Sequence, residues 1–134
     1  MDTHNTSSQL PYLFFYSFVI LFVGMGLMPV LPLYAANFGA NSSITGLYLS
    51  VIYVSITVST VLTGWLGLKL GRKRLFVISA ALGAPALALM GQVSSLWQVV
   101  ILTALVWFSG GICMTLVNVF TGLYASKDDR GKWF

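Results

Sequence analysis

The sequence predicts an all-α protein, a polytopic transmembrane helical bundle of four spans, and two observations support this. Hydrophobic residues make up 57% of the 134 residues and charged residues only 7%, whereas about a quarter of the residues of a soluble domain are charged. The apolar residues also fall into four runs that are each long enough to cross a bilayer, which takes about 20 residues of helix. Only short polar segments separate these runs, so no soluble domain fits between them.

The first span is expected over residues 11–36, after a flexible, cytoplasmic N-terminus at residues 1–10. Its second half carries four residues that disturb helices: Gly24, Gly26, Pro29 and Pro32. Each proline removes a backbone donor and crowds the preceding turn, so this half is expected to bend. Two interpretations stay open: a kink without further role, and a bent helix that lines a cavity.

The second and third spans, at residues 44–68 and 75–93, each carry a stripe of small residues. In the second span, residues four apart share one helical face: Ser55, Ser59, Thr63 and Gly67. The third span repeats the spacing with Ala80, Ala84 and Ala88. Small residues allow two helices to approach closely in lipid, so the stripe of the second span is expected at a helix–helix contact. The alternative is that this stripe faces a substrate path.

The fourth span is expected over residues 96–125 and leads into a polar segment at 127–134. Asn118 is the most polar side chain of this span. Because an amide in lipid favours a partner, Asn118 either bonds to another helix or faces a cavity. The helix–helix hydrogen bond is the simpler assignment.

The basic residues predict the orientation of the spans. Four of the seven Lys and Arg residues lie between positions 64 and 74, and the other three lie between 127 and 134. Positive charge beside membrane-spanning helices is retained on the cytoplasmic side. We therefore expect a multi-pass protein of the cell membrane with both termini in the cytoplasm. Topology and contact with lipid headgroups explain the formal charge of +4, so no nucleic-acid partner is expected.

The first basic segment also carries a pattern of glycines and cations. It reads Gly64-x-x-x-Leu68-Lys69-x-Gly71-Arg72-Lys73. This resembles the signature between helices 2 and 3 of the major facilitator superfamily, Gly-x-x-x-Asp-Arg/Lys-x-Gly-Arg-Arg/Lys. The single departure is Leu68, which stands where the family has an aspartate.

The resemblance implies the first four helices of a twelve-helix transporter, which are part of its N-terminal six-helix half. Residues 28–35 resemble the end of helix 1 in drug:proton antiporters, which places the chain nearest the multidrug efflux branch. Such proteins move a small molecule by rocking two bundles about a central site. Four helices are a third of that fold, so we expect a fragment that is inactive alone and whose partners are the lipid bilayer, the substrate and the missing remainder of the chain.

The sequence offers little for other chemistry. No acid lies between Asp2 and Asp128, and Cys113 and His4 are the only residues of their types, so neither has the partners of a His–Cys metal cluster. No glycine-rich nucleotide loop is present. We therefore expect no enzymatic activity, no catalytic or metal site and no cofactor. The alternative to a transporter fragment is a self-contained, oligomeric four-helix membrane protein with a structural or accessory role.

Overall fold

The computed structural model describes residues 10–124. It contains four long helices, α1 (Leu10–Ala36), α2 (Ser42–Leu70), α3 (Arg72–Leu89) and α4 (Leu96–Tyr124), and a short 3₁₀ helix, η2 (Met90–Gln92). All four long helices have the length and apolar composition to cross a membrane. The predicted all-α fold with four spans is confirmed. Residues 1–9 of the expected N-terminus and the expected loop at 127–134 lie outside the described residues.

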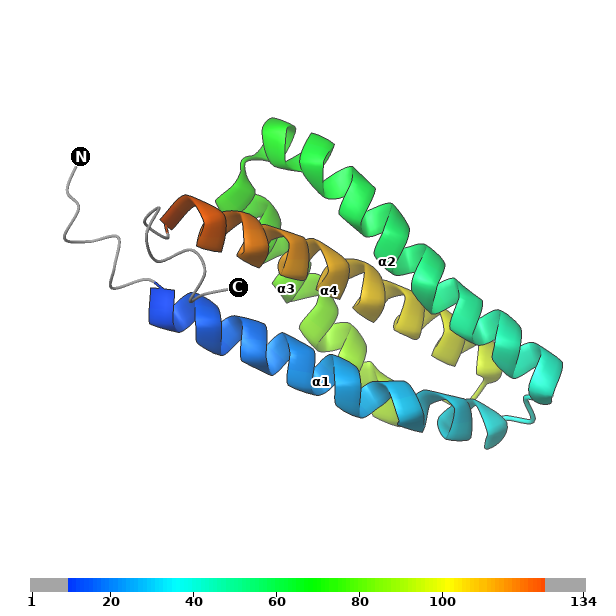
Figure 1. Ribbon diagram of the computed structural model, residues 1–134. Helices are drawn as coiled ribbons and strands as arrows, with labels where there is room; N and C mark the ends of the chain where they lie inside the picture. The colour runs from blue at the N-terminus through cyan, green and yellow to red at the C-terminus, as the bar shows by residue number, and fades with distance from the viewer. Residues whose placement is uncertain (1–9, 125–134) are drawn as a thin grey trace.

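α4 is the central helix of the bundle. Figure 1 shows α2 on one side of α4, α1 on the other and α3 behind it. Burial follows this arrangement: within the most apolar 18-residue stretch of each helix, 39% of the residues of α4 are buried inside the protein and none of those of α1. The buried residues of α1, Leu31 and Ala35, lie in its last turns, while nearer its start Tyr16 meets Phe76 of α3 edge to face.

Small residues set the distance between α4 and its two main neighbours. A Cβ on Gly111 of α4 would overlap the Oγ of Ser59 on α2 and lie 3.4 Å from the carbonyl oxygen of Ile56. On the other side, a Cβ on Gly83 of α3 would lie 2.5 Å from the Oγ of Ser109 on α4. One glycine–serine contact therefore brings each neighbour against α4, as expected for helices that pack in lipid.

The two predicted stripes of small residues have different environments. On α2, Ser59 and Thr63 are buried, so the expected contact face is confirmed there. On α3, the alanine stripe is exposed throughout: Ala80, Ala84 and Ala88. This helix packs instead through the face that carries Leu75, Ser79 and Ala86.

At the end of the bundle away from the basic segment, local hydrogen bonds stabilise the end of α1 and the start of α2. At the end of α1, Gly39 has a φ of 81°, and the backbone N–H groups of Gly39 and Ala40 donate to the carbonyls of Ala36 and Ala35. This is the Schellman arrangement, in which a glycine with positive φ ends a helix. Asn41 then caps α2, because its Oδ1 accepts from the backbone N–H of Ile44 at 3.0 Å.

A glutamine side chain supports the start of α4 in a similar way. The Oε1 of Gln98 accepts hydrogen bonds from the backbone N–H groups of Ser94 and Ser95, at 2.9 and 3.3 Å. Gln98 lies three residues after Ser95, the spacing of a capping box. The connection from η2 to α4 is thereby held without any charged residue.

Candidate functional site

The basic segment forms a turn of a single residue. Gly71 is both the last cap of α2 and the first cap of α3, with φ 83° and ψ 136°. Its carbonyl accepts from the backbone N–H of Leu75 at 3.0 Å. Arg72, Lys73 and Arg74 thus lie in the first helical turn of α3 rather than in a loop. The third helix therefore starts three residues before the expected position 75.

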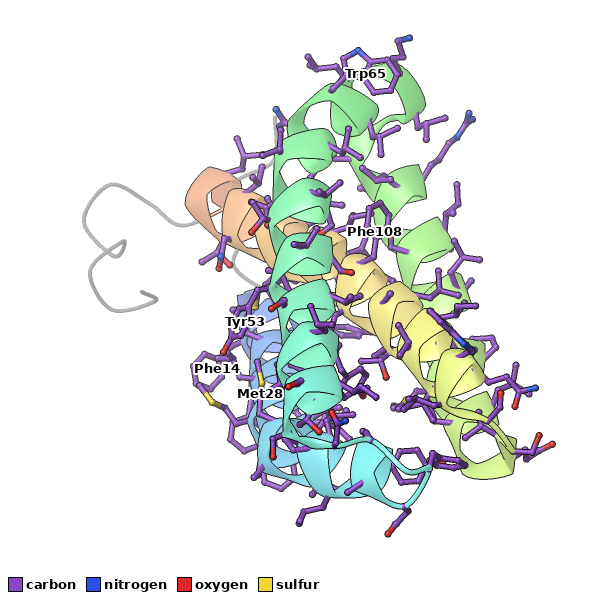
Figure 2. The ribbon with its side chains drawn as sticks, turned by 90° about the vertical axis from the view of Figure 1, so that its right-hand side faces the viewer. Phe14, Met28, Tyr53, Trp65 and Phe108 are labelled. Carbon is purple, nitrogen blue, oxygen red and sulfur yellow. The ribbon has the colours of Figure 1, made fainter. Side chains whose placement is uncertain are left out.

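The cations of this turn are exposed and spread around it. The Nζ of Lys69 lies 4.0 Å from the ring centroid of Trp65, a cation–π contact. On another face of α2, a Cβ on Gly67 would lie 3.7 Å from the Cγ of Arg72, so the arginine stem runs beside that glycine. Figure 2 shows Trp65 at the tip of the bundle. No acidic residue occurs among residues 10–124 to pair with these cations.

The family-type pattern is brought together at this end of the bundle. Leu68 is 82% exposed, and Gly64 is exposed with no atom near the position of a Cβ. Lys69, Gly71, Arg72 and Lys73 are also exposed. The structure therefore presents all six positions on the surface, where a further part of a protein or a lipid can reach them.

The residues expected to form a kink or cavity do not come together into one site. α1 is assigned as one α-helix through Pro29 and Pro32. Gly24 faces α4, since a Cβ there would lie 3.6 Å from the Cη2 of Trp107. By contrast, Gly26 has no atom within 4 Å of the position of a Cβ. Pro29 is exposed and Pro32 half-buried.

Asn118 lies on an exposed face of α4. None of the hydrogen bonds found among residues 10–124 involves its side chain. Asn118 follows Trp107 by eleven residues, close to three full turns, so both lie on the same side of α4. This is the side that meets Gly24 of α1.

Among the described residues, two tyrosine hydroxyl groups make contacts between helices that the sequence did not indicate, beside a weaker contact of the Cys113 thiol with the carbonyl of Phe76 at 4.0 Å. The hydroxyl groups of Tyr48 on α2 and Thr103 on α4 are 2.8 Å apart in a buried hydrogen bond. The hydroxyl of Tyr34 on α1 donates to the carbonyl of Met90 in η2. Both contacts lie in the half of the bundle away from the basic turn. The one sequence feature that both contacts share is a tyrosine within an apolar run.

The remaining hydroxyl groups bond mostly within their own helices. Thr63, for example, donates to the carbonyl of Ser59 at 2.6 Å, and Thr121 to that of Val117 at 2.9 Å. No group of three or more metal-binding side chains occurs in the part of the chain that the structure describes. The described hydroxyl groups therefore serve mainly the helices that carry them and the contacts between those helices.

The chain matches the model of the Major Facilitator Superfamily over residues 13–134. Among curated proteins, it is 33% identical over 92 residues to "Multidrug resistance protein MdtG" of Salmonella choleraesuis and 34% identical over 89 residues to the protein of the same name from Salmonella arizonae. These alignments cover 65% and 63% of this chain but 23% and 22% of those proteins. The chain thus spans about a quarter of the length of these relatives. No solved structure matches it significantly.

Proposed function

Since the chain belongs to the Major Facilitator Superfamily, we propose that its four helices act as part of the N-terminal half of a secondary transporter for a small molecule. The observation that carries this proposal is the pattern from Gly64 to Lys73, presented at the turn between α2 and α3. Similarity to proteins named for multidrug resistance favours drug efflux as the activity.

The exposure of α1 supports a role within a larger assembly. Nearly all of its first 20 residues are exposed or half-buried, and its aromatic side chains are among the most exposed of the bundle. A transporter that alternates access needs a second bundle against which the first can move. We propose that further helices of a longer protein cover α1 and complete the pathway.

The charge distribution supports an orientation for these helices. The turn between α2 and α3, which carries Lys69, Arg72, Lys73 and Arg74, lies at the end of the bundle where α1 begins and α4 ends (Figure 1). By the positive-inside rule this end faces the cytoplasm. We propose a multi-pass protein of the cell membrane with both termini inside.

Proton coupling would need groups from elsewhere. Proton relays in membranes use Asp, Glu and His, and the chain has none of these between His4 and Asp128. If transport is driven by protons, the carrier must therefore lie outside α1 to α4. These helices would then supply packing, gating and contact with the substrate.

A chimera tests the proposed function. In it, this chain replaces the matching segment of the Salmonella choleraesuis relative, and the host cells lack their own drug efflux. We expect the chimera to raise drug resistance above that of cells with an empty vector, and Gly71→Ala within it to reduce the effect. Resistance no higher than that of the empty vector, with normal amounts of chimera in the membrane, would contradict the proposal.

The self-contained alternative is tested with the 134-residue chain alone. The chain is reconstituted in proteoliposomes and assayed for drug flux under a pH gradient. We expect no saturable flux, because a second bundle and membrane carboxylates are both lacking in this sequence. Saturable, gradient-driven flux would favour the self-contained four-helix protein and overturn the proposed dependence on further helices.

A further inference from the structure

We propose that the turn between α2 and α3 is a docking surface for anionic phospholipid headgroups. The surface consists of four cations, Lys69, Arg72, Lys73 and Arg74, together with the exposed apolar residues Trp65 and Leu68. It would give the protein a preference for anionic lipid in the leaflet that it contacts. This inference does not depend on transport, because it rests on the charge and position of the turn.

The charge of this surface has no compensation among the described residues. Lys69, Arg72, Lys73 and Arg74 are all exposed, and residues 10–124 include no Asp or Glu. Three of the four cations also occupy the first turn of α3, where the helix dipole repels positive charge. Bound anions would relieve both sources of repulsion.

The position of the surface selects a lipid as the anion. Lys69 lies in the last turn of α2, and Arg72 is the first residue of α3. Both helices have the length and composition of membrane spans. The cations therefore lie where a span ends, at the level of the headgroups. Lys and Arg residues beside a span attract anionic lipids through the surface potential of the leaflet.

The apolar neighbours of the cations fit the same occupant. Trp65 is 54% exposed and Leu68 is 82% exposed. Tryptophan prefers the membrane interface, and Lys69 rests over its ring at 4.0 Å. One side of the surface can thus contact the glycerol and upper acyl region while the cations contact phosphates. A soluble anion would use the cations only and would leave the exposed apolar residues unexplained.

The absence of an acid at Leu68 makes this surface wholly cationic. An aspartate at that position would add a carboxylate next to Lys69 and within a few residues of Arg72. It would reduce the attraction for phosphate and offer the cations a protein partner. Position 68 therefore determines how strongly the turn prefers anionic lipid.

The test compares lipid association in vesicles. The purified 134-residue chain is reconstituted in phosphatidylcholine, and the association of spin-labelled phosphatidylglycerol is measured relative to spin-labelled phosphatidylcholine. We expect the chain to prefer phosphatidylglycerol, and the variant K69Q/R72Q/K73Q/R74Q to lose about two-fold or more of that preference. The charge-conserving variant K69R/R72K/K73R/R74K is expected to keep it. Circular dichroism verifies that all variants remain helical.

Two further controls make the result specific. Leu68→Asp is expected to weaken the preference and Leu68→Asn to leave it unchanged, since the two side chains differ mainly in charge. Neutralising the three cations between 127 and 134 is expected to have the smaller effect, because Asp128 and Asp129 stand next to these cations in the sequence and already reduce their attraction for anions. Equal preference in the wild type and the four-fold neutral variant would overturn the proposal. Displacement by inorganic phosphate beyond that by sodium chloride of equal ionic strength would assign the surface to soluble anions instead.

Discussion

Gly71 joins α2 to α3 alone, and its backbone explains why a glycine is needed. Its φ of 83° with ψ of 136° lies in a region that residues with a Cβ rarely adopt, at a cost of about 1–3 kcal/mol. The obstacle is conformational, because no atom lies within 4 Å of the position of a Cβ. The tight turn and the proximity of its cations thus depend on this residue.

We expect Gly71→Ala to lower the free energy of unfolding by about 1–3 kcal/mol. Titration of the purified chain in detergent with sodium dodecyl sulfate, followed by circular dichroism, measures the change. The matched control is Gly46→Ala, an exposed position within α2 that also has open space around it. In a helix interior alanine is favoured over glycine by about 1 kcal/mol, so the control should be neutral or stabilising. Equal effects of the two substitutions would contradict the argument.

Tyr48 makes the buried hydroxyl contact between α2 and α4, at 2.8 Å from the Oγ1 of Thr103. We expect Tyr48→Phe to destabilise the bundle by about 1 kcal/mol, since Thr103 would lose its partner between helices. A double-mutant cycle with Thr103→Val should give a coupling of about 0.6 kcal/mol, the average for such bonds in membranes.

Tyr53→Phe is the matched control for this cycle, because Tyr53 is an exposed tyrosine on the same helix and is labelled in Figure 2. Its loss of a hydroxyl group should leave the unfolding free energy nearly unchanged. If the two tyrosine substitutions have the same effect, or the cycle shows no coupling, the buried contact contributes nothing specific to the bundle.

Leu68 is the residue at which the turn departs from its family. The family resemblance implies that an acid at this position pairs with the loop arginine and with the other half of the transporter in the outward-facing state. Within the chimera described above, we therefore expect Leu68→Asp to increase the outward-facing population, provided that the second half retains its partner. Reactivity of cysteines introduced on the two faces measures it, with Leu68→Asn as the uncharged control. Unchanged populations would show that the departure is neutral.

At the scale of helices, two adjacent glycines of α4 allow the effect of close packing on stability to be distinguished from the effect of helix propensity. A Cβ on Gly111 would overlap the Oγ of Ser59, a residue with 0% exposure, and would lie 3.4 Å from the backbone oxygen of Ile56. Gly110, by contrast, has open space at the same point. Rotation of the Ser59 side chain away from an added Cβ would break its 2.8 Å hydrogen bond to the carbonyl of Ile56. The overlap therefore cannot be relieved without loss of this bond or a shift of α2.

We expect Gly111→Ala to destabilise the bundle by about 1–3 kcal/mol through overpacking, and Gly110→Ala to be neutral or to stabilise it by up to about 1 kcal/mol. Ser59→Ala in the Gly111→Ala background should recover part of the loss, because it removes the overlapping oxygen. The unfolding titration used for Gly71 provides the measurement. A failure of Ser59→Ala to rescue, or equal effects at positions 110 and 111, would show that this contact does not determine the helix spacing.

The number, order and type of the helices follow from the sequence because hydrophobicity and length dictate them. Contact faces follow less well. In lipid both faces of a span are apolar, so spacing identifies a small-residue face but not what it meets. Ser59 and Thr63 are buried as expected, whereas Ala84, in an equivalent stripe, is exposed.

The composition of the basic turn is evident from the sequence, but its geometry is not. Arg72 to Arg74 read as a loop because they are charged, yet arginine and lysine are good helix formers, and a glycine with positive φ reverses the chain in one residue. The contact between Tyr48 and Thr103 spans 55 positions. It depends on the register between α2 and α4, which no local pattern contains.

For the whole molecule, the separation of charge predicts how the bundle crosses the membrane. The described cations lie at one end, from Lys69 to Arg74, and the connections at the other end, residues 37–41 and 93–95, are uncharged. Three further cations lie between 127 and 134, after α4 in the sequence. Moving the basic end across the membrane would oppose the retention of positive charge on the cytoplasmic side.

Single cysteines in a Cys113→Ser background test this orientation in intact cells. Asn37 and Lys73 are suitable positions, because both are exposed, whereas Asn41 caps α2 and its replacement would disturb the helix start. We expect a membrane-impermeant maleimide to label Asn37→Cys from outside and Lys73→Cys only after the membrane is permeabilised. The Cys113→Ser chain without a new cysteine shows the background. Labelling of position 73 but not 37 would reverse the orientation. Labelling of both positions from outside would contradict the single orientation that charge at only one end of the bundle predicts.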